Sequence, residues 1–121
     1  MANEVTVSVS MSFSKSGVTD ALSFSDLQFD VSGSKLIHHV QNVAITADQA
    51  LDIGNLTTPG FMIVRNLDDT NFITMSGVTG LATQTIKLKA GECALFRHMG
   101  TAPVASADTA AVSIEYLLIE D

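Results

Sequence analysis

Three histidines and one cysteine are the side chains of this sequence best suited to metal binding or nucleophilic chemistry. His38 and His39 are neighbours, and His98 lies far along the chain. On a β-strand, adjacent side chains point to opposite faces, so this pair cannot share a metal ion as a His-x-His pair does. A metal site would need carboxylates whose spacing the sequence does not supply. We therefore expect no metal site and interpret the histidines as surface or interface residues.

The single cysteine, Cys93, has no partner for an internal disulfide. It precedes Ala94, Leu95 and Phe96, and no Cys-x-x-Cys motif surrounds it. We therefore predict that Cys93 is a small buried apolar residue rather than a reactive thiol.

Other motifs that carry chemistry are also missing or weak. The sequence has no Gly-x-Ser-x-Gly elbow, and Gly77–Gly80 lacks the following lysine of a phosphate-binding loop. Asp68–Asn71 lacks the alternating spacing of a calcium loop and favours a turn. Asn55–Thr57 matches a glycosylation sequon but has no secretory context. We predict that the protein is not an enzyme and needs no cofactor.

Length and composition favour one globular domain over residues 1–121. Apolar residues make up 46% and charged residues 16% of the chain, and the net charge is −7. This acidity argues against binding nucleic acid or an anionic membrane. No apolar run approaches the ~20 residues of a membrane helix. Met1–Glu4 lacks the features of a signal peptide, which predicts a protein that is made and kept in a cytosol.

The elements that would position any site are predicted from alternation. Between Val5 and Phe13 every odd residue is apolar and every even residue is Ser or Thr, which predicts a strand with one buried and one wet face. Ser16-Gly17 is typical of a turn. In the next strand, apolar residues change phase at Ser25-Asp26, which predicts a bulge or bend.

Further strands are expected downstream, with Leu36–Ile45, Phe61–Val64, Phe72–Met75, Ile86–Lys89, Cys93–Arg97 and Val112–Leu118 as the candidates. Phe61–Val64 reads as covered on both sides, and Phe72–Met75 is expected to pair with it as a hairpin. Thr46–Gln49 matches a capping box, but Gly54 limits any helix there, so a strand or loop is favoured. Gly100–Asp108 is expected to be a surface loop. About eight or nine short strands predict an all-β fold, an antiparallel β-sandwich or jelly roll.

The second half of the chain resembles a known class of proteins. The segments Gly60–Phe72, Ile86–Glu92 and Val112–Asp121 are similar to stretches of small virion proteins of tailed bacteriophages. The resemblance covers roughly residues 41–121 and rests on a strand–turn–strand and a Lys-Ala-Gly-Glu turn. It implies a β-sandwich or jelly-roll component of the particle.

The resemblance implies a capsid decoration (cement) protein located in the virion and assembled in the host cytoplasm. Such a protein would bind the outside of the head, bridge subunits of the major capsid protein, and form a homo-oligomer, most plausibly a trimer. A tail, fibre or head-spike part is the alternative within the same class.

Candidate interface residues lie in two segments, chosen because an N-terminal strand and a long loop are accessible places for association. They are Val5, Val7 and Val9 in the first segment and Thr101, Pro103 and Thr109 in the second. An ordinary core edge and an ordinary surface loop are the competing interpretations.

Two functions of other classes compete with a structural role. A carbohydrate-binding jelly roll would stack sugars on exposed aromatic rings, but the chain has no Trp, one Tyr and six Phe. A cupin-like metalloenzyme would need His-x-His on one strand, where this sequence has His38-His39.

Overall fold

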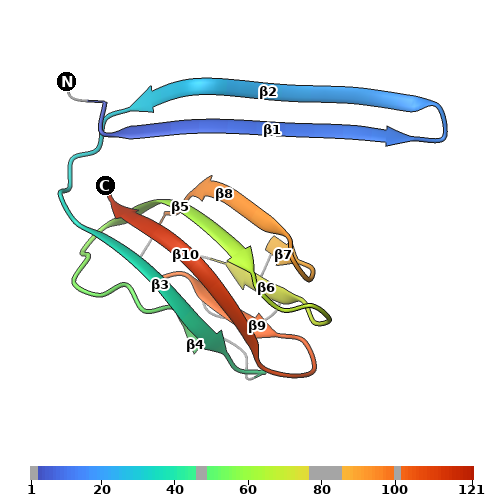
Figure 1. Cartoon of the computed structure of the whole chain (residues 1–121). Helices are drawn as coiled ribbons and strands as arrows, with labels where there is room; N and C mark the ends of the chain where they lie inside the picture. The colour runs from blue at the N-terminus through green and yellow to red at the C-terminus, as the bar shows by residue number, and fades with distance from the viewer. Residues whose placement is uncertain (1–2, 46–48, 77–85, 100–101) are drawn as a thin grey trace. The chain divides into compact units, whose positions relative to one another are not determined.

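A computed structural model describes residues 3–45, 49–76, 86–99 and 102–121. Within these ranges it contains ten strands and no helix, so the predicted all-β antiparallel fold is confirmed. The chain forms two compact units, Met1–Ser32 and Gly33–Asp121. Each unit is drawn in Figure 1 and is described by itself below. Among the described residues there is no helix long and apolar enough to cross a bilayer.

The first unit is one long antiparallel hairpin, formed by β1 (Val5–Lys15) and β2 (Val18–Phe29). The predicted turn joins them: Ser16 and Gly17 have φ angles of 53° and 80°. Two-residue hairpin turns that match the twist of the strands need positive φ at both positions. Glycine adopts such angles at no steric cost, so Gly17 helps to set the register of the whole hairpin.

The predicted irregularity in β2 is a β-bulge. Val7 faces Leu27 and Val9 faces Phe24, so Ser8 alone opposes both Ser25 and Asp26. Asp26 has a φ of 57°, and its backbone N–H donates to Ser8 Oγ at 3.2 Å. The extra residue compensates for the phase change in the sequence. As a result, the apolar residues on both sides of the bulge lie on the same face.

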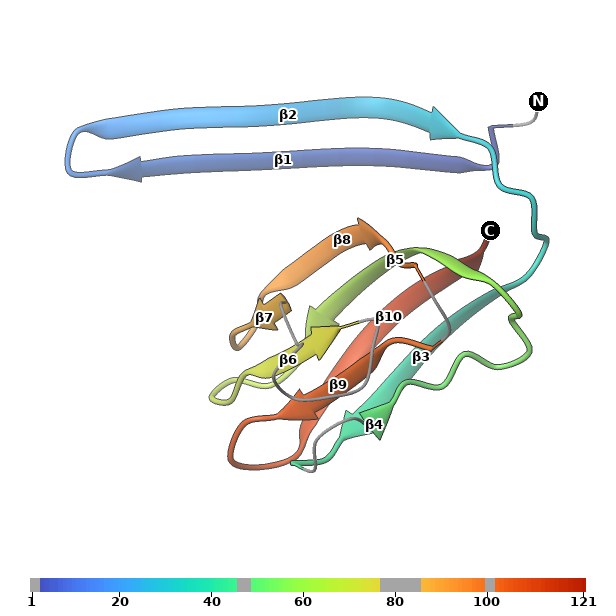
Figure 2. The same ribbon diagram turned by 180° about the vertical axis from the view of Figure 1, so that it is seen from behind.

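The second unit is a sandwich of two four-stranded antiparallel sheets. One sheet has the order β3-β10-β5-β8, with bounds Leu36–Val43, Val112–Glu120, Pro59–Asn66 and Cys93–Arg97. The other has the order β4-β9-β6-β7, with bounds Gln49–Ala50, Val104–Ala107, Ile73–Ser76 and Ile86–Leu88. Figures 1 and 2 show the two layers from opposite sides.

The core lies between these two sheets and draws on both. The first sheet contributes Val43, Met62, Val64, Val112, Ile114, Tyr116 and Leu118; the second contributes Ile73, Met75, Leu88, Ala105 and Ala107. Along β10 buried and half-buried residues alternate without interruption, as expected for a strand with one face on a core. Burying each large side chain contributes about 1.5–3 kcal/mol. This core holds the eight sandwich strands in place.

Two expectations about β5 are wrong. Met62 and Val64 are buried, but Ile63 between them is 46% exposed, so only one face of the strand is covered. In addition, β5 pairs with β10 and β8, whereas β6 pairs with β7 and β9. The turn after Asn66 therefore crosses from one sheet to the other instead of closing a hairpin.

The side chains of this turn explain the crossing. Asn66 Nδ2 donates to the carbonyls of Asn71 and Leu88 at 2.9 and 3.0 Å, and its Oδ1 accepts from the Asp68 N–H at 2.8 Å. Asp68 Oδ2 accepts from the amides of Thr70 and Asn71. These bonds hold the chain at a corner between the layers, with Asn66 fully buried.

The expectation of a surface loop at Gly100–Asp108 is also wrong. Within it, Val104–Ala107 forms β9, which is buried along its whole length and pairs with β4 and β6. Pro103 before it is fully buried, and its carbonyl accepts from the Leu51 N–H at 2.9 Å. Small residues fit between the sheets but give no alternation to detect, and β9 was missed for this reason.

The sandwich thus comprises residues of the second unit, and the first two predicted strands form a separate hairpin. That the chain forms a single domain over residues 1–121 stays a prediction.

Candidate functional site

The two adjacent histidines point to opposite sides of β3, as predicted. His39 lies on the same side of β3 as the core residue Val43, and His38 lies on the outer side. His38 Nε2 is 2.7 Å from Glu115 Oε2, whereas His39 Nε2 is 3.9 Å from Asp52 Oδ2. The third histidine, His98, is 7% exposed. Among the residues that the structure describes, no group of three or more potential ligands lies close enough to hold a metal ion.

A polar cluster surrounds the hydroxyl of Tyr116, which is 1% exposed. This hydroxyl shares its single proton between two acceptors, Gln41 Oε1 at 3.1 Å and the carbonyl of Asp52. Gln41 Oε1 also accepts from the Asp52 N–H at 2.8 Å, and the His39 ring lies edge-on to Tyr116. Burial, followed by the charge of Asp52, raises the pKa of Tyr116 to about 12. The phenol therefore stays protonated at neutral pH, and the cluster ties the Asp52 loop to the sheet.

A second polar cluster lies where the sandwich begins and ends. Glu120, 6% exposed, accepts from the N–H and Oγ1 of Thr57 at 2.9 and 3.0 Å. The Thr57 N–H is the main cause that lowers the pKa of this carboxyl. A Cβ at Gly33 would lie 2.4 Å from Glu120 Cγ, so only glycine permits this approach. These contacts join segments far apart in the sequence and are structural.

Cys93 is exposed, which corrects the prediction that it is buried. It stands on β8 at a position that alternates with Ala94 and Phe96, which pack against the core. Neighbouring apolar residues suggested burial, but the alternation places Cys93, Leu95 and Arg97 on the outer side. A lone exposed cysteine does not define a site.

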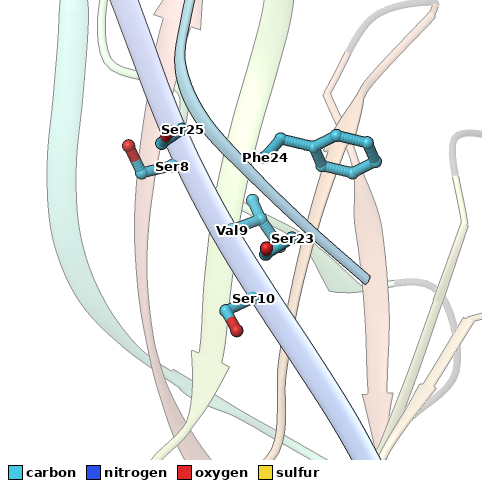
Figure 3. Close-up of a pocket in the computed structure, with 6 residues that line it drawn as sticks. All are labelled: Ser8, Val9, Ser10, Ser23, Phe24 and Ser25. Atoms are coloured by element: carbon cyan, nitrogen blue, oxygen red, sulfur yellow. The ribbon is translucent and has the colours of Figure 1, made fainter. Parts of the chain in front are cut away.

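One face of the hairpin is an extended apolar surface. The register places ten apolar residues on this face, called here the apolar ribbon: Val5, Val7, Val9, Met11, Phe13, Val18, Leu22, Phe24, Leu27 and Phe29. The opposite face, called here the hydroxyl face, carries Thr6, Ser8, Ser10, Ser12, Ser14, Thr19, Ala21, Ser23 and Gln28. Figure 3 shows the middle of the hairpin, where Val9, Phe24 and four serines line an open hollow.

Most of the apolar ribbon is exposed. The base of the ribbon, which is the end away from the turn, is less exposed: Val5 is 8% exposed, and Val7 and Phe29 are half-buried. The exposed fractions of the others are Val9 37%, Met11 71%, Phe13 54%, Val18 61%, Leu22 59%, Phe24 45% and Leu27 39%. The expectation that the odd-numbered residues from Val5 to Phe13 form a buried face is thus wrong beyond the base. The hairpin is a sheet of two strands, and among the described residues no third strand pairs with β1 or β2.

The six residues proposed from sequence as an interface are divided between the two units. Val5, Val7 and Val9 belong to the apolar ribbon, with Val9 the exposed one. Pro103 is buried, and Thr101 lies outside the described residues. Thr109 is exposed, and its Oγ1 donates to Asn71 Oδ1 at 3.0 Å. The burial of Pro103 leaves it little surface to offer a partner, and that these residues form an interface stays a prediction.

Sequence reasoning missed the larger part of the ribbon, from Met11 to Leu27. The signal was present: β2 carries its apolar residues in two phases, and one bulge brings them onto the face of the β1 valines. Only the pairing of the two strands shows that they form one surface.

The outer face of the first sandwich sheet also carries exposed apolar residues, but it is mixed. Leu36, Val40, Ile63 and Leu95 are 37–63% exposed. Half-buried Glu115 and exposed Arg65 pair in register on this face between Val40 and Cys93. Such interspersed charges are ordinary for a solvated face, so the hairpin offers the stronger candidate.

Comparisons with models of protein families, with curated proteins and with solved structures found no match to this chain. The function is therefore inferred from the surfaces and residues described above.

Proposed function

We propose that this chain is a structural protein that works as part of a protein assembly. The observation that supports it best is the apolar ribbon, because seven large side chains stand exposed on one face of a hairpin. Monomeric proteins rarely expose a contiguous apolar patch above about 300–600 Å², and larger patches mark interaction surfaces. A two-stranded hairpin is at best marginally stable on its own in water. Both facts are explained if another protein covers the ribbon.

The more specific proposal is a capsid decoration (cement) protein of a tailed bacteriophage. Its support is the resemblance of Gly60–Phe72, Ile86–Glu92 and Val112–Asp121 to small virion proteins. These segments contain β7, β10 and all of β5 except Pro59, and therefore supply three of the eight strands of the sandwich. The protein would bind the outer head surface, bridge subunits of the major capsid protein and be located in the virion. A tail, fibre or head-spike component would use the same kind of surface.

A structural role also fits the chemistry of the buried polar residues. Tyr116 and Glu120 each hold loops to strands through hydrogen bonds. We therefore propose that the chain has no catalytic activity and needs no cofactor. The net charge of −7 suits a partner other than nucleic acid or an anionic membrane.

Co-sedimentation with phage heads tests this proposal. Purified protein is mixed with heads stripped of accessory proteins, and bound protein is measured against concentration, with tails as the matched control. Saturable binding to heads with a fixed number of copies per capsid subunit is expected. Binding to tails alone would place the protein in a tail, and binding to neither particle would overturn the virion role.

A further inference from the structure

We propose that a second copy of this chain covers the apolar ribbon. Two hairpins would pack with their ribbons face to face, related by a two-fold axis along the hairpins, so that both turns lie at the same end. This inference rests on the proposed structural role and specifies how copies associate. Three independent features of the hairpin support it: area, side-chain size and charge.

The exposed area matches what a stable pair requires. Taking about 150–250 Å² for a fully exposed large side chain, the seven exposed ribbon residues present on the order of 700 Å². A specific interface of standard size buries about 800 Å² on each partner. The ribbon alone thus provides nearly the whole of one partner's share.

Side-chain sizes are complementary in this arrangement. A two-fold axis along the hairpins places β1 of one copy over β2 of the other and keeps each rung of the ladder at the same height. Val7 then faces Leu27, and Val9 faces Phe24, of the second copy. Each of these rungs therefore sets a small residue against a large one, which is how facing layers interdigitate without voids. The reverse arrangement, with turns at opposite ends, sets β1 over β1 and, when all rungs overlap, places Lys15 over Val5 and Asp20 over Leu27 of the second copy.

The charged residues of this face favour the same orientation. Lys15 pairs with Val18 and Phe13 with Asp20, so the charges that the register places on this face lie on its last two rungs, next to the turn. With both turns at one end, Lys15 of each copy lies one rung from Asp20 of the other, and opposite charges attract across the interface. With turns at opposite ends, the same Lys15 would lie over the apolar base of the partner, where burial of an unpaired charge is costly.

The hydroxyl face explains why association would stop at a closed pair. It carries small polar residues, with Ser10 facing Ser23 and Ser14 facing Thr19. Once the two ribbons cover each other, the outer faces of the pair are hydrophilic. A two-fold interface uses the same patch on both copies and closes on itself.

Sedimentation equilibrium of three proteins tests the surface. Leu22→Asp introduces a charge on the ribbon, and the matched control Ala21→Asp introduces it one residue earlier on the hydroxyl face; both positions are exposed. The native chain and Ala21→Asp are expected to form dimers with similar dissociation constants, while Leu22→Asp weakens the dimer at least ~100-fold. A native chain that stays monomeric, or equal effects of the two variants, would overturn the proposal. A native trimer would overturn the two-fold packing.

Crosslinking tests the orientation. In a Cys93→Ser background, Val18→Cys is treated with a short bismaleimide, and Thr19→Cys on the hydroxyl face is the control. With turns at one end, the two positions 18 lie within about 10 Å of each other, whereas the reverse arrangement separates them by about 30 Å. Efficient dimer crosslinking of Val18→Cys but not of Thr19→Cys is expected, and no crosslinking of Val18→Cys would refute the orientation.

These results separate the inference from the proposed function. A monomer that still saturates phage heads would refute the self-association and leave the virion role intact. A dimer that binds no particle would support the self-association and refute the virion role. Cooperative unfolding, followed by the fluorescence of Tyr116, shows that the sandwich of each variant is folded.

Discussion

Replacing Tyr116 with phenylalanine tests how the polar cluster stabilises the sandwich. The change removes one hydroxyl and leaves the ring in the core, where it is 1% exposed. The carbonyl of Asp52 loses this donor, while Gln41 Oε1 keeps its bond from the Asp52 N–H at 2.8 Å. The bond to Asp52 is partly buried, and an ordinary hydrogen bond contributes about 0.5–1.5 kcal/mol net. We therefore expect a loss of about 1 kcal/mol of unfolding free energy.

The same residue predicts how stability falls at high pH. The pKa of Tyr116 is raised from 10.0 to about 12 in the folded protein, mainly by burial and then by Asp52. A raised pKa means that the stabilising contribution is complete below the unfolded pKa and is lost as pH rises from about 10 through 12. This rise in the pKa of Tyr116 corresponds to roughly 2.7 kcal/mol of unfolding free energy. We reduce this value to about 1–2 kcal/mol because water reaches the neighbouring Asp52. Tyr116→Phe should lose this part of the alkaline destabilisation.

The assay is direct because the sequence has one Tyr and no Trp. Ultraviolet absorbance of the phenolate, followed against pH, reports the pKa of Tyr116 alone. Urea unfolding followed by circular dichroism gives the stability of both proteins at neutral and alkaline pH. Titration of the folded protein near 10, or a variant as stable as the native chain at neutral pH, would refute the reasoning.

Two further predictions concern other polar contacts. Asn66→Ala removes donors to the carbonyls of Leu88 and Asn71 at a fully buried corner, so urea unfolding should show a loss of about 2–3 kcal/mol. An unchanged unfolding midpoint would contradict the role of Asn66 in the sheet crossing. Glu120→Gln tests acid stability: the bonds from Thr57 lower the pKa of Glu120 below its ordinary 4.5, so its contribution is present above that pH and is lost as the pH falls below it. The native chain should therefore lose more stability than Glu120→Gln between neutral and acidic pH, and equal pH profiles would contradict this.

Much of the fold can be predicted from alternation and turn residues. Strict alternation from Val5 and from Val112 predicts β1 and β10, and the phase change at Ser25-Asp26 predicts the bulge. These patterns are formed by residues adjacent in the sequence, so they can be detected without knowing how the strands pair. The strand β9 gives no such signal, because it is buried along its whole length and its small side chains do not alternate between apolar and polar types.

The pairing of sheets and the covering of faces were harder to predict. A turn such as Asn66–Asn71 has the same residue types whether it closes a hairpin or crosses between layers, and buried hydrogen bonds to Leu88 decide the outcome. The alternation of β1 correctly identifies an apolar face, but a pattern within one chain does not say which molecule covers it. The candidate site was therefore found at Val9 and missed from Met11 to Leu27.

Amide hydrogen exchange, measured at several protein concentrations, tests most directly whether another chain covers the hairpin. A contact between copies stabilises β1 and β2 by mass action, so their protection should rise with concentration, while that of β10 in the sandwich core stays constant. Protection of β1 and β2 that is the same at every concentration, whether high or negligible, would contradict the account.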